Sequence, residues 1–246
     1  MNVLSIGNSF SQDAQRYLHQ IAEVDGGNVQ CVNLYIGGCP LSKHYQNMLS
    51  EERAYLLEEN GNSTGVYVSL KEAILDRRWD VITLQQVSQQ SPNYETYQPY
   101  LDELVAYVRR LVPNAKIAIH QTWAYEQGSQ RLNEELNYRD YKEMLGDIVK
   151  SYRKAADRIH ADYIIPSGEV FGAILENGIE KIHRDTFHAS LGLGRYALGL
   201  TWYKILTGKD IWQNTFSDFD EVIPAEQIMI AKKCVHKVAD RTTDSK

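Results

Sequence analysis

The chain has 246 residues, 43% of them hydrophobic, so it can bury a full core, and we expect one domain over residues 1–246. The net charge of −6 and the pI near 5.7, without clustered lysine and arginine, argue against a nucleic-acid partner. The apolar stretches span only a handful of residues, so neither a membrane span nor a signal peptide is expected in the chain as given. A trimmed secreted or periplasmic protein would look the same, which leaves the compartment open.

The three cysteines, Cys31, Cys39 and Cys234, form no CxxC pair and no metal-ligand spacing. Neither a disulfide framework nor a structural zinc is therefore indicated. No metal or other cofactor is expected, so the fold has to be stabilised by packing alone.

In chain order, short β-rich runs alternate with longer amphipathic stretches, which is typical of βα units around a parallel sheet. Five runs are apolar enough to be buried strands: residues 3–6, 29–35, 81–84, 116–120 and 163–165. Six stretches are predicted as helices: residues 12–24, 43–58, 98–112, 133–160, 191–206 and 225–239. Ser69-Leu70-Lys71-Glu72 has capping-box spacing and predicts another helix before the third strand. The predicted fold class is α/β, with a small, doubly wound, five-stranded parallel sheet.

The strands lead into residues that can bind a ligand. In an open α/β sheet, ligands bind beyond the carboxyl ends of the strands. The first four predicted strands are followed by Gly7-Asn8-Ser9, Gly37-Gly38-Cys39, Gln85-Gln86-Val87-Ser88-Gln89 and His120-Gln121-Thr122-Trp123. A long loop after the fifth leads to Asp185-x-x-His188. One site at this edge of the sheet would explain all of these segments.

Ser9, His188 and Asp185 have the chemistry of a serine nucleophile and its base. A hydroxyl needs an imidazole to take its proton and a carboxylate to orient that imidazole. Ser9 at the start of a helix would lie beside free backbone N–H groups, which favour a developing oxyanion. His188 would carry the proton, and Asp185, one turn away, could accept the other imidazole N–H.

An oxyanion hole needs two or three fixed donors. The N–H of Ser9, the N–H of Gly38 and the side chain of Gln85 or Gln89 are the candidates. His44 and Trp123 are candidates for touching substrate, although histidine and tryptophan at such positions are more often packing residues. Taken alone, a serine at the position of Ser9 is more often a helix cap than a nucleophile, and Asp185 with His188 could form a surface capping interaction. Their chain order and their places at strand ends favour the triad.

These blocks resemble the SGNH or GDSL-type hydrolases, a family of serine esterases and lipases with a flavodoxin-like, three-layer α/β/α fold. Gly7-Asn8-Ser9-Phe10-Ser11 is similar to the family's nucleophile block, and Asp185-Thr186-Phe187-His188 to its last block. Aligning Asn33 to Gly38 with the second block puts Gly38 at the oxyanion position.

Two blocks depart from the family pattern. Gln85 to Gln90 stands where the family has Gly-x-Asn-Asp, so an amide one methylene longer would replace the asparagine donor. Asn8 replaces the family's aspartate and removes a charge beside the nucleophile. These departures are typical of a divergent branch.

The sequence is therefore interpreted as a serine ester hydrolase, and the resemblance implies that it removes small O-acyl groups from a carbohydrate. A small-molecule or carbohydrate ester is the expected partner. Two alternatives stay open: a lipase or thioesterase, and a non-catalytic carbohydrate-binding domain on the same scaffold, which the altered third block favours. The sequence specifies neither the acyl length, nor the alcohol, nor the oligomeric state.

Overall fold

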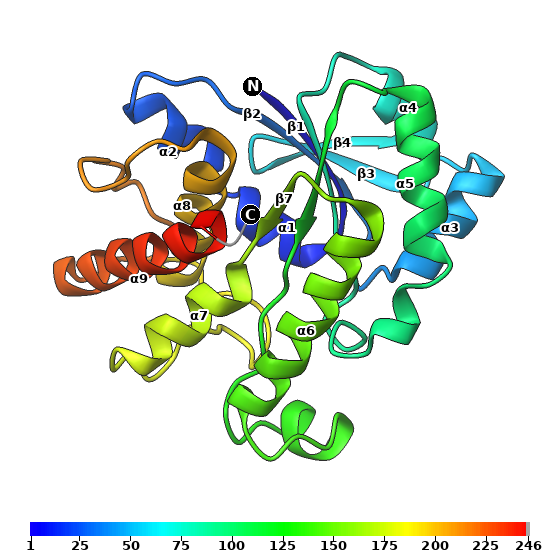
Figure 1. Cartoon of the computed structure of the whole chain (residues 1–246). Coiled ribbons are helices and arrows are strands. Elements are labelled where there is room, and N and C mark those ends of the chain that lie inside the picture. Colours follow the sequence, from blue (N-terminus) through cyan, green and yellow to red (C-terminus); the bar gives the residue numbers. More distant parts are fainter. Residues whose placement is uncertain (245–246) are drawn as a thin grey trace.

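A computed structural model describes residues 1–244, and within them seven strands form one mixed sheet in the order β4-β3-β2-β1-β5-β6-β7 (Figure 1). The five predicted strands are all present as its parallel part: β1 (Asn2–Gly7), β2 (Gln30–Tyr35), β5 (Val81–Leu84), β6 (Lys116–His120) and β7 (Tyr163–Ile165). β5 is buried over its whole length, as a strand covered on both faces requires. The order of these five reverses at β1, which creates the crevice typical of a doubly wound fold.

The prediction of five strands was too low, because β2 also pairs with an antiparallel hairpin. Its strands are β3 (Tyr55–Glu59) and β4 (Asn62–Val68). Asn60 and Gly61 join them, both with positive φ, the conformation of a type I′ turn. The Asn-Gly pair is the sequence signal for this turn. Because residues 43–58 were assigned to a helix, no strand was expected before the pair, and the hairpin was missed.

Helices cover both faces of the sheet (Figure 1). One layer, on the left of Figure 1, contains α1 (Ser9–Gln15), α2 (Leu18–Val24), α7 (Ser167–Glu176), α8 (Leu193–Thr207) and α9 (Ala225–Asp244). The other layer contains α3 (Leu41–Ser50), α4 (Leu70–Leu75), α5 (Tyr100–Leu111) and α6 (Tyr141–Ile159). The prediction of a three-layer α/β/α fold is confirmed.

Several predicted helices were too long because local turn chemistry interrupts them. α3 ends where Glu51 adopts a left-handed conformation. α6 begins only after Asp140, whose side chain accepts the N–H of Glu143. The helix predicted over residues 12–24 is two helices, and α7 was predicted as a loop. The capping box at Ser69 and Glu72 is present and starts α4.

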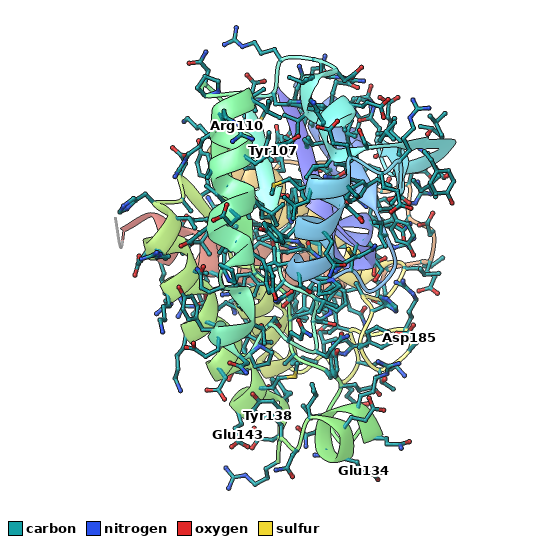
Figure 2. All side chains as sticks on the ribbon, turned by 90° about the vertical axis from the view of Figure 1, so that its right-hand side faces the viewer. Tyr107, Arg110, Glu134, Tyr138, Glu143 and Asp185 are labelled. Atoms are coloured by element: carbon teal, nitrogen blue, oxygen red, sulfur yellow. The ribbon has the colours of Figure 1, made fainter. Side chains whose placement is uncertain are left out.

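Between β6 and α6 the chain makes an excursion, residues 126–140, which includes the short helix η2 (Arg131–Glu135). Figure 2 labels Glu134 and Tyr138 of this excursion at the lower end of the molecule, with Asp185 also in the lower half. Tyr107 and Arg110 of α5 lie toward the opposite end. The excursion therefore projects at the end of the molecule where the loop that contains Asp185 lies.

Candidate active site

The carboxyl ends of β1, β2 and β5 lead into one pocket of about 320 Å³. Ser9, Gly38, Gln89 and His188 are among the residues that line it. The loops after three strands and the loop before α8 thus contribute to one place, as the reversal of strand order predicts.

The turn after β1 presents Ser9 at the first position of α1. Asn8 caps the helix through its side-chain oxygen, which accepts the N–H of Phe10, while Ser11 Oγ accepts the N–H of Asn8. Gly7 is required here, because a Cβ at this position would lie 1.9 Å from Ser11 Oγ. The tight turn therefore depends on the absence of a side chain directly before Asn8 and Ser9.

Ser9, His188 and Asp185 form a continuous chain of hydrogen bonds. Ser9 Oγ lies 2.8 Å from His188 Nε2, and His188 Nδ1 lies 2.8 Å from Asp185 Oδ2. The carboxylate can only accept, so Nδ1 carries the proton and Nε2 is free to accept from Ser9. Asp185 Oδ1 also accepts the backbone N–H of His188, at 2.9 Å. Partial burial raises the pKa of Asp185, but its bonds to His188 outweigh this and the net direction is downward, so the carboxylate is ionised at neutral pH.

The N–H groups of Ser9 and Gly38 are available for an oxyanion. Gly38 has φ of +60°, a conformation that favours glycine, and both residues line the pocket. Within residues 1–244, neither N–H donates to a protein acceptor. Gln89 lines the same pocket, and its side chain makes no hydrogen bond among the described residues. The structure thus brings together Ser9, Gly38 and Gln89.

Gln85 does not line the pocket, so the prediction that its amide faces substrate is corrected. The side chain is buried, and its Nε2 donates to Asn8 Oδ1 at 2.7 Å. Its Oε1 accepts from His120 Nδ1 at 2.7 Å, and His120 Nε2 accepts from Ser167 Oγ. Burial lowers the pKa of His120 to about 3, so this ring is neutral. Both ends of the Gln85 amide are thus hydrogen-bonded beneath the turn between β1 and α1, where Gln85 holds the side chain of Asn8.

His44 and Trp123, proposed as substrate contacts, are packing residues without access to the pocket. His44 is fully buried, with its pKa lowered to about 3 by burial, and its Nδ1 bonds to the Tyr55 hydroxyl. Trp123 stacks on Phe10 at 4.1 Å between ring centroids and donates from Nε1 to the carbonyl of Phe187. Trp123 therefore holds the loop that contains Phe187 and His188 through a hydrogen bond to the Phe187 backbone.

An ion-pair network joins α1 to the loop that contains Asp185 and His188. Asp13 of α1 has a fully buried side chain, and both of its oxygens lie 2.9 Å from Arg184 Nη1. Arg195 of α8 pairs with Asp13 as well and also with Asp220. Because Arg184 directly precedes Asp185, the network ties the two halves of the candidate triad together. The sequence does not indicate this network, because Asp13 lies 171 residues from Arg184 and 182 residues from Arg195 along the chain.

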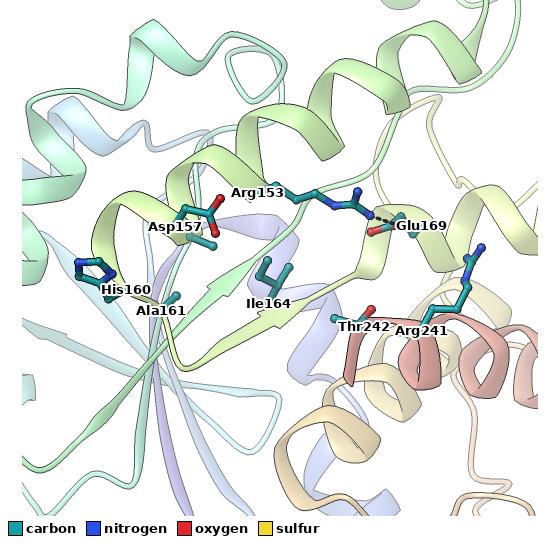
Figure 3. A pocket seen from close by; sticks show the side chains of 9 residues that line it. Arg153, Asp157, His160, Ala161, Ile164, Glu169, Arg241 and Thr242 are labelled. Carbon is teal, nitrogen blue, oxygen red and sulfur yellow. Dashed lines mark hydrogen bonds and ion pairs between the residues drawn. The ribbon is translucent and has the colours of Figure 1, made fainter. Parts of the chain in front are cut away.

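A larger hollow elsewhere on the molecule is a less suitable site. Its volume is about 980 Å³, and Arg153, Glu169 and Arg241 are among the residues that line it (Figure 3). Arg153 and Glu169 pair with one another at 3.3 Å. Its described lining residues include no serine or cysteine, and the one hydroxyl among them, that of Thr242, donates to the backbone carbonyl of Val238 instead of to the histidine.

The described residues contain no group of three or more His, Cys, Asp or Glu side chains that could hold a metal ion. Burial raises the pKa of the Cys39 thiol, beside Gly38, to about 12, so Cys39 is not the nucleophile. No helix within the described residues is both long and apolar enough to span a membrane.

Comparison with solved structures shows which proteins share this fold. A DUF4886 family protein from Bacteroides uniformis ATCC 8492 is 33% identical, with a TM-score of 0.88, over 97% of this chain and 94% of that one. A proposed SGNH hydrolase from Slackia heliotrinireducens is 19% identical, with a TM-score of 0.60, over 84% of this chain and 98% of that one. A proposed GDSL-like lipase from Parabacteroides merdae ATCC 43184 is 14% identical, with a TM-score of 0.54, over 82% and 94%.

No curated protein matches the sequence. A family model described as a domain of unknown function, DUF4886, matches residues 2–238. The chain therefore belongs to the DUF4886 family, and it has the fold of the SGNH hydrolases.

Proposed function

We propose that this protein is a serine ester hydrolase in which Ser9 is the nucleophile, His188 the general base and acid, and Asp185 the residue that orients His188. The observation that carries the proposal is the unbroken chain of hydrogen bonds from Ser9 through His188 to Asp185, with Ser9 facing a pocket. The same three groups perform acyl transfer on unrelated folds, because the chemistry depends on their geometry alone.

In the proposed reaction, Ser9 Oγ attacks the ester carbonyl while His188 Nε2 takes its proton. The N–H groups of Ser9 and Gly38 stabilise the oxyanion. His188 then protonates the departing alcohol, which leaves an acyl ester on Ser9. Water, deprotonated by His188, attacks this ester, releases the carboxylic acid and restores the serine.

Gln89 is the proposed third oxyanion donor. It follows the same strand as the family's asparagine donor, and its free amide lines the pocket beside Ser9 and Gly38. Gln85 is excluded from this role by its bonds to Asn8 and His120.

The size of the pocket favours a small acyl group. Small-molecule sites usually enclose about 300–1,000 Å³, and the pocket of about 320 Å³ lies at the lower end of that range. A long fatty acyl chain would need an extended apolar groove, whereas Ser88, Gln89 and two arginines form part of this wall. Removal of a small O-acyl group from a carbohydrate is therefore proposed over lipase or thioesterase activity.

The test compares wild type and Ser9→Ala on p-nitrophenyl acetate, butyrate and octanoate and on acetylated sugars. Ser63→Ala, at an exposed serine of β4 in the hairpin, is the matched control. We expect acetate turnover in wild type and the control, loss of turnover in Ser9→Ala, and declining rates with longer acyl chains. A fluorophosphonate should add one label to wild type, detected as a mass shift, and none to Ser9→Ala.

An inactive, unlabelled wild type that still binds sugars would replace the proposal with the non-catalytic carbohydrate-binding domain. Full activity in Ser9→Ala would refute the assignment of the nucleophile. A preference for octanoate would refute the small acyl group and favour a lipase.

A further inference from the structure

The wall of the candidate pocket carries positive charge, although the chain has a net charge of −6. Two of its lining residues are the arginines Arg131 and Arg184, and none of its described lining residues is aspartate or glutamate. In a protein with more acidic than basic residues, this local excess is a property of the site and not of the whole surface.

Arg131 reaches the triad from the excursion between β6 and α6. Its guanidinium carbon lies 4.1 Å from the centroid of the Phe187 ring, and that ring lies 3.9 Å from the His188 ring. Phe187 therefore contacts both Arg131 and the candidate base, with the planes of its ring and of the His188 ring inclined by 37°. Figure 2 shows the neighbouring Glu134 at the lower end of the molecule, in the same half as Asp185.

Among the described residues, Arg131 bonds to the neutral Tyr125 hydroxyl and forms no ion pair. No carboxylate of the described side chains lies within ion-pairing distance of it, whereas Arg184 is paired with the buried Asp13. An arginine held over an aromatic ring keeps its N–H donors at the edge of the guanidinium plane, where they can bind oxygen atoms in a bidentate manner.

Three carboxylates that bond to lining residues of the pocket already have partners. Asp185 accepts two hydrogen bonds from His188, and Asp13 is shared by Arg184 and Arg195. Glu58 is buried, and its two carboxylate oxygens accept hydrogen bonds from the side-chain amides of Gln12 and Asn33. None of these groups is placed to cancel the charge of Arg131.

We propose that the substrate carries an anionic oxygen group, such as a carboxylate or a sulfate, which Arg131 binds next to the ester bond that Ser9 attacks. This inference rests on the proposed ester hydrolase function and specifies the class of its substrate. Arg131 would act as a binding residue on the side of the pocket formed by Phe187 and His188. A small acylated sugar that carries an acidic substituent matches both the volume and the charge of the pocket.

The test uses three O-acetylated methyl galactosides that differ only at C6: the neutral alcohol, the carboxylate and the sulfate. Wild type, Arg131→Gln and Arg131→Lys are compared with Arg139→Gln, which removes a solvent-exposed arginine from the same excursion. p-Nitrophenyl acetate reports on the triad without any anionic group.

We expect at least one charged galactoside to exceed the neutral one by about tenfold or more in kcat/KM, since a charged hydrogen bond contributes about 1.5–3 kcal/mol. The preference should fall to near unity in Arg131→Gln, mainly through KM, be partly retained in Arg131→Lys, and persist in Arg139→Gln. Turnover of p-nitrophenyl acetate should be unchanged in Arg139→Gln. Any change of this basal rate in the Arg131 variants cancels in the preference, because the preference is the ratio of charged to neutral galactoside measured with the same variant. The preferred member identifies the anion as carboxylate or sulfate.

Equal rates for neutral and charged galactosides in wild type, or an unchanged preference in Arg131→Gln, would overturn the inference while leaving the esterase intact. Direct binding of galacturonate, galactose 6-sulfate and galactose, measured by calorimetry, separates the two proposals. Binding of a charged sugar that requires Arg131, in a protein without esterase activity, would support the anion site and refute the esterase. Absence of any such binding to an inactive protein would overturn both.

Discussion

Asp13→Asn should destabilise the protein much more than a change of the same kind at the surface. The side chain of Asp13 is fully buried and pairs with both Arg184 and Arg195 at 2.9 Å. Asparagine has nearly the same shape but no charge, so the substitution leaves two arginines facing a neutral group. Removing one partner of a buried ion pair typically costs about 3–5 kcal/mol. For a chain of this length, that corresponds to a melting temperature lower by about 6–20 °C.

Urea denaturation, followed by circular dichroism, measures the loss as a shift of the midpoint at constant slope. Asp76→Asn is the matched control, because Asp76 pairs with Arg77 at 2.6 Å through a side chain that is 53% exposed. Exposed pairs of this kind contribute about 0–1 kcal/mol. If Asp13→Asn shifts the midpoint no more than Asp76→Asn, the network does not hold α1 to the loop before Asp185.

Three further results are expected. Asp185→Asn should lower kcat by about 10⁴ with little change in stability, since it disturbs the tautomer of His188; activity near wild type would contradict its assigned role. Gly7→Ala should lower the free energy of unfolding, measured by urea denaturation, by about 1–3 kcal/mol, because the new Cβ would clash with Ser11 Oγ. An unchanged urea midpoint would show that the turn can rearrange to accommodate the methyl group. The free energy of unfolding should fall by up to about 4 kcal/mol between pH 6 and pH 5, because His44, His120 and His183 stay neutral in the folded protein but bind protons in the unfolded chain. Urea denaturation at several pH values measures this, and a free energy of unfolding that is the same at pH 6 and pH 5 would refute it.

The sign of the pH effect follows from the direction of the shifts. Burial lowers the pKa of His44 and His120 to about 3 and that of His183 to about 4, all below the value near 6.5 expected in the unfolded chain. The unfolded state therefore binds more protons in this range, and acid favours it. Most carboxylates titrate at lower pH, so the effect at pH 5–6 belongs mainly to histidines.

The parallel strands and the order of the site segments could be read from sequence. A strand buried on both faces needs a continuous apolar run, as at residues 81–84, so its position is visible without any knowledge of its neighbours. The turn from β1 into α1 and the Asp185–His188 pair can also be recognised in the sequence, because each is formed by residues that are only a few positions apart. The Asn60–Gly61 turn was equally local, but the preceding polar and apolar residues matched a helical period and concealed it.

The roles of the amides and aromatics could not be decided in this way. Gln85 and Gln89 have the same chemistry four residues apart, yet one is buried against Asn8 and His120 and the other lines the pocket. Trp123 follows the end of β6, and His44 lies in the first turns of α3, positions from which a side chain could reach a ligand, but both are buried in the core. Which way a side chain faces after a strand end depends on loops packed from elsewhere in the chain.

The fold class, the five parallel strands and the segments that approach the candidate site follow from the amino-acid sequence alone, because they depend on local apolar patterning and on the geometry of parallel sheets. Three sets of contacts become visible only in the folded molecule: Ser9 with His188 at 2.8 Å, Asp13 with Arg184 and Arg195, and Arg131 with the Phe187 ring. These contacts join residues 56 to 182 positions apart. They arise from how the helices and loops pack on the sheet, for which no local pattern in the chain is diagnostic.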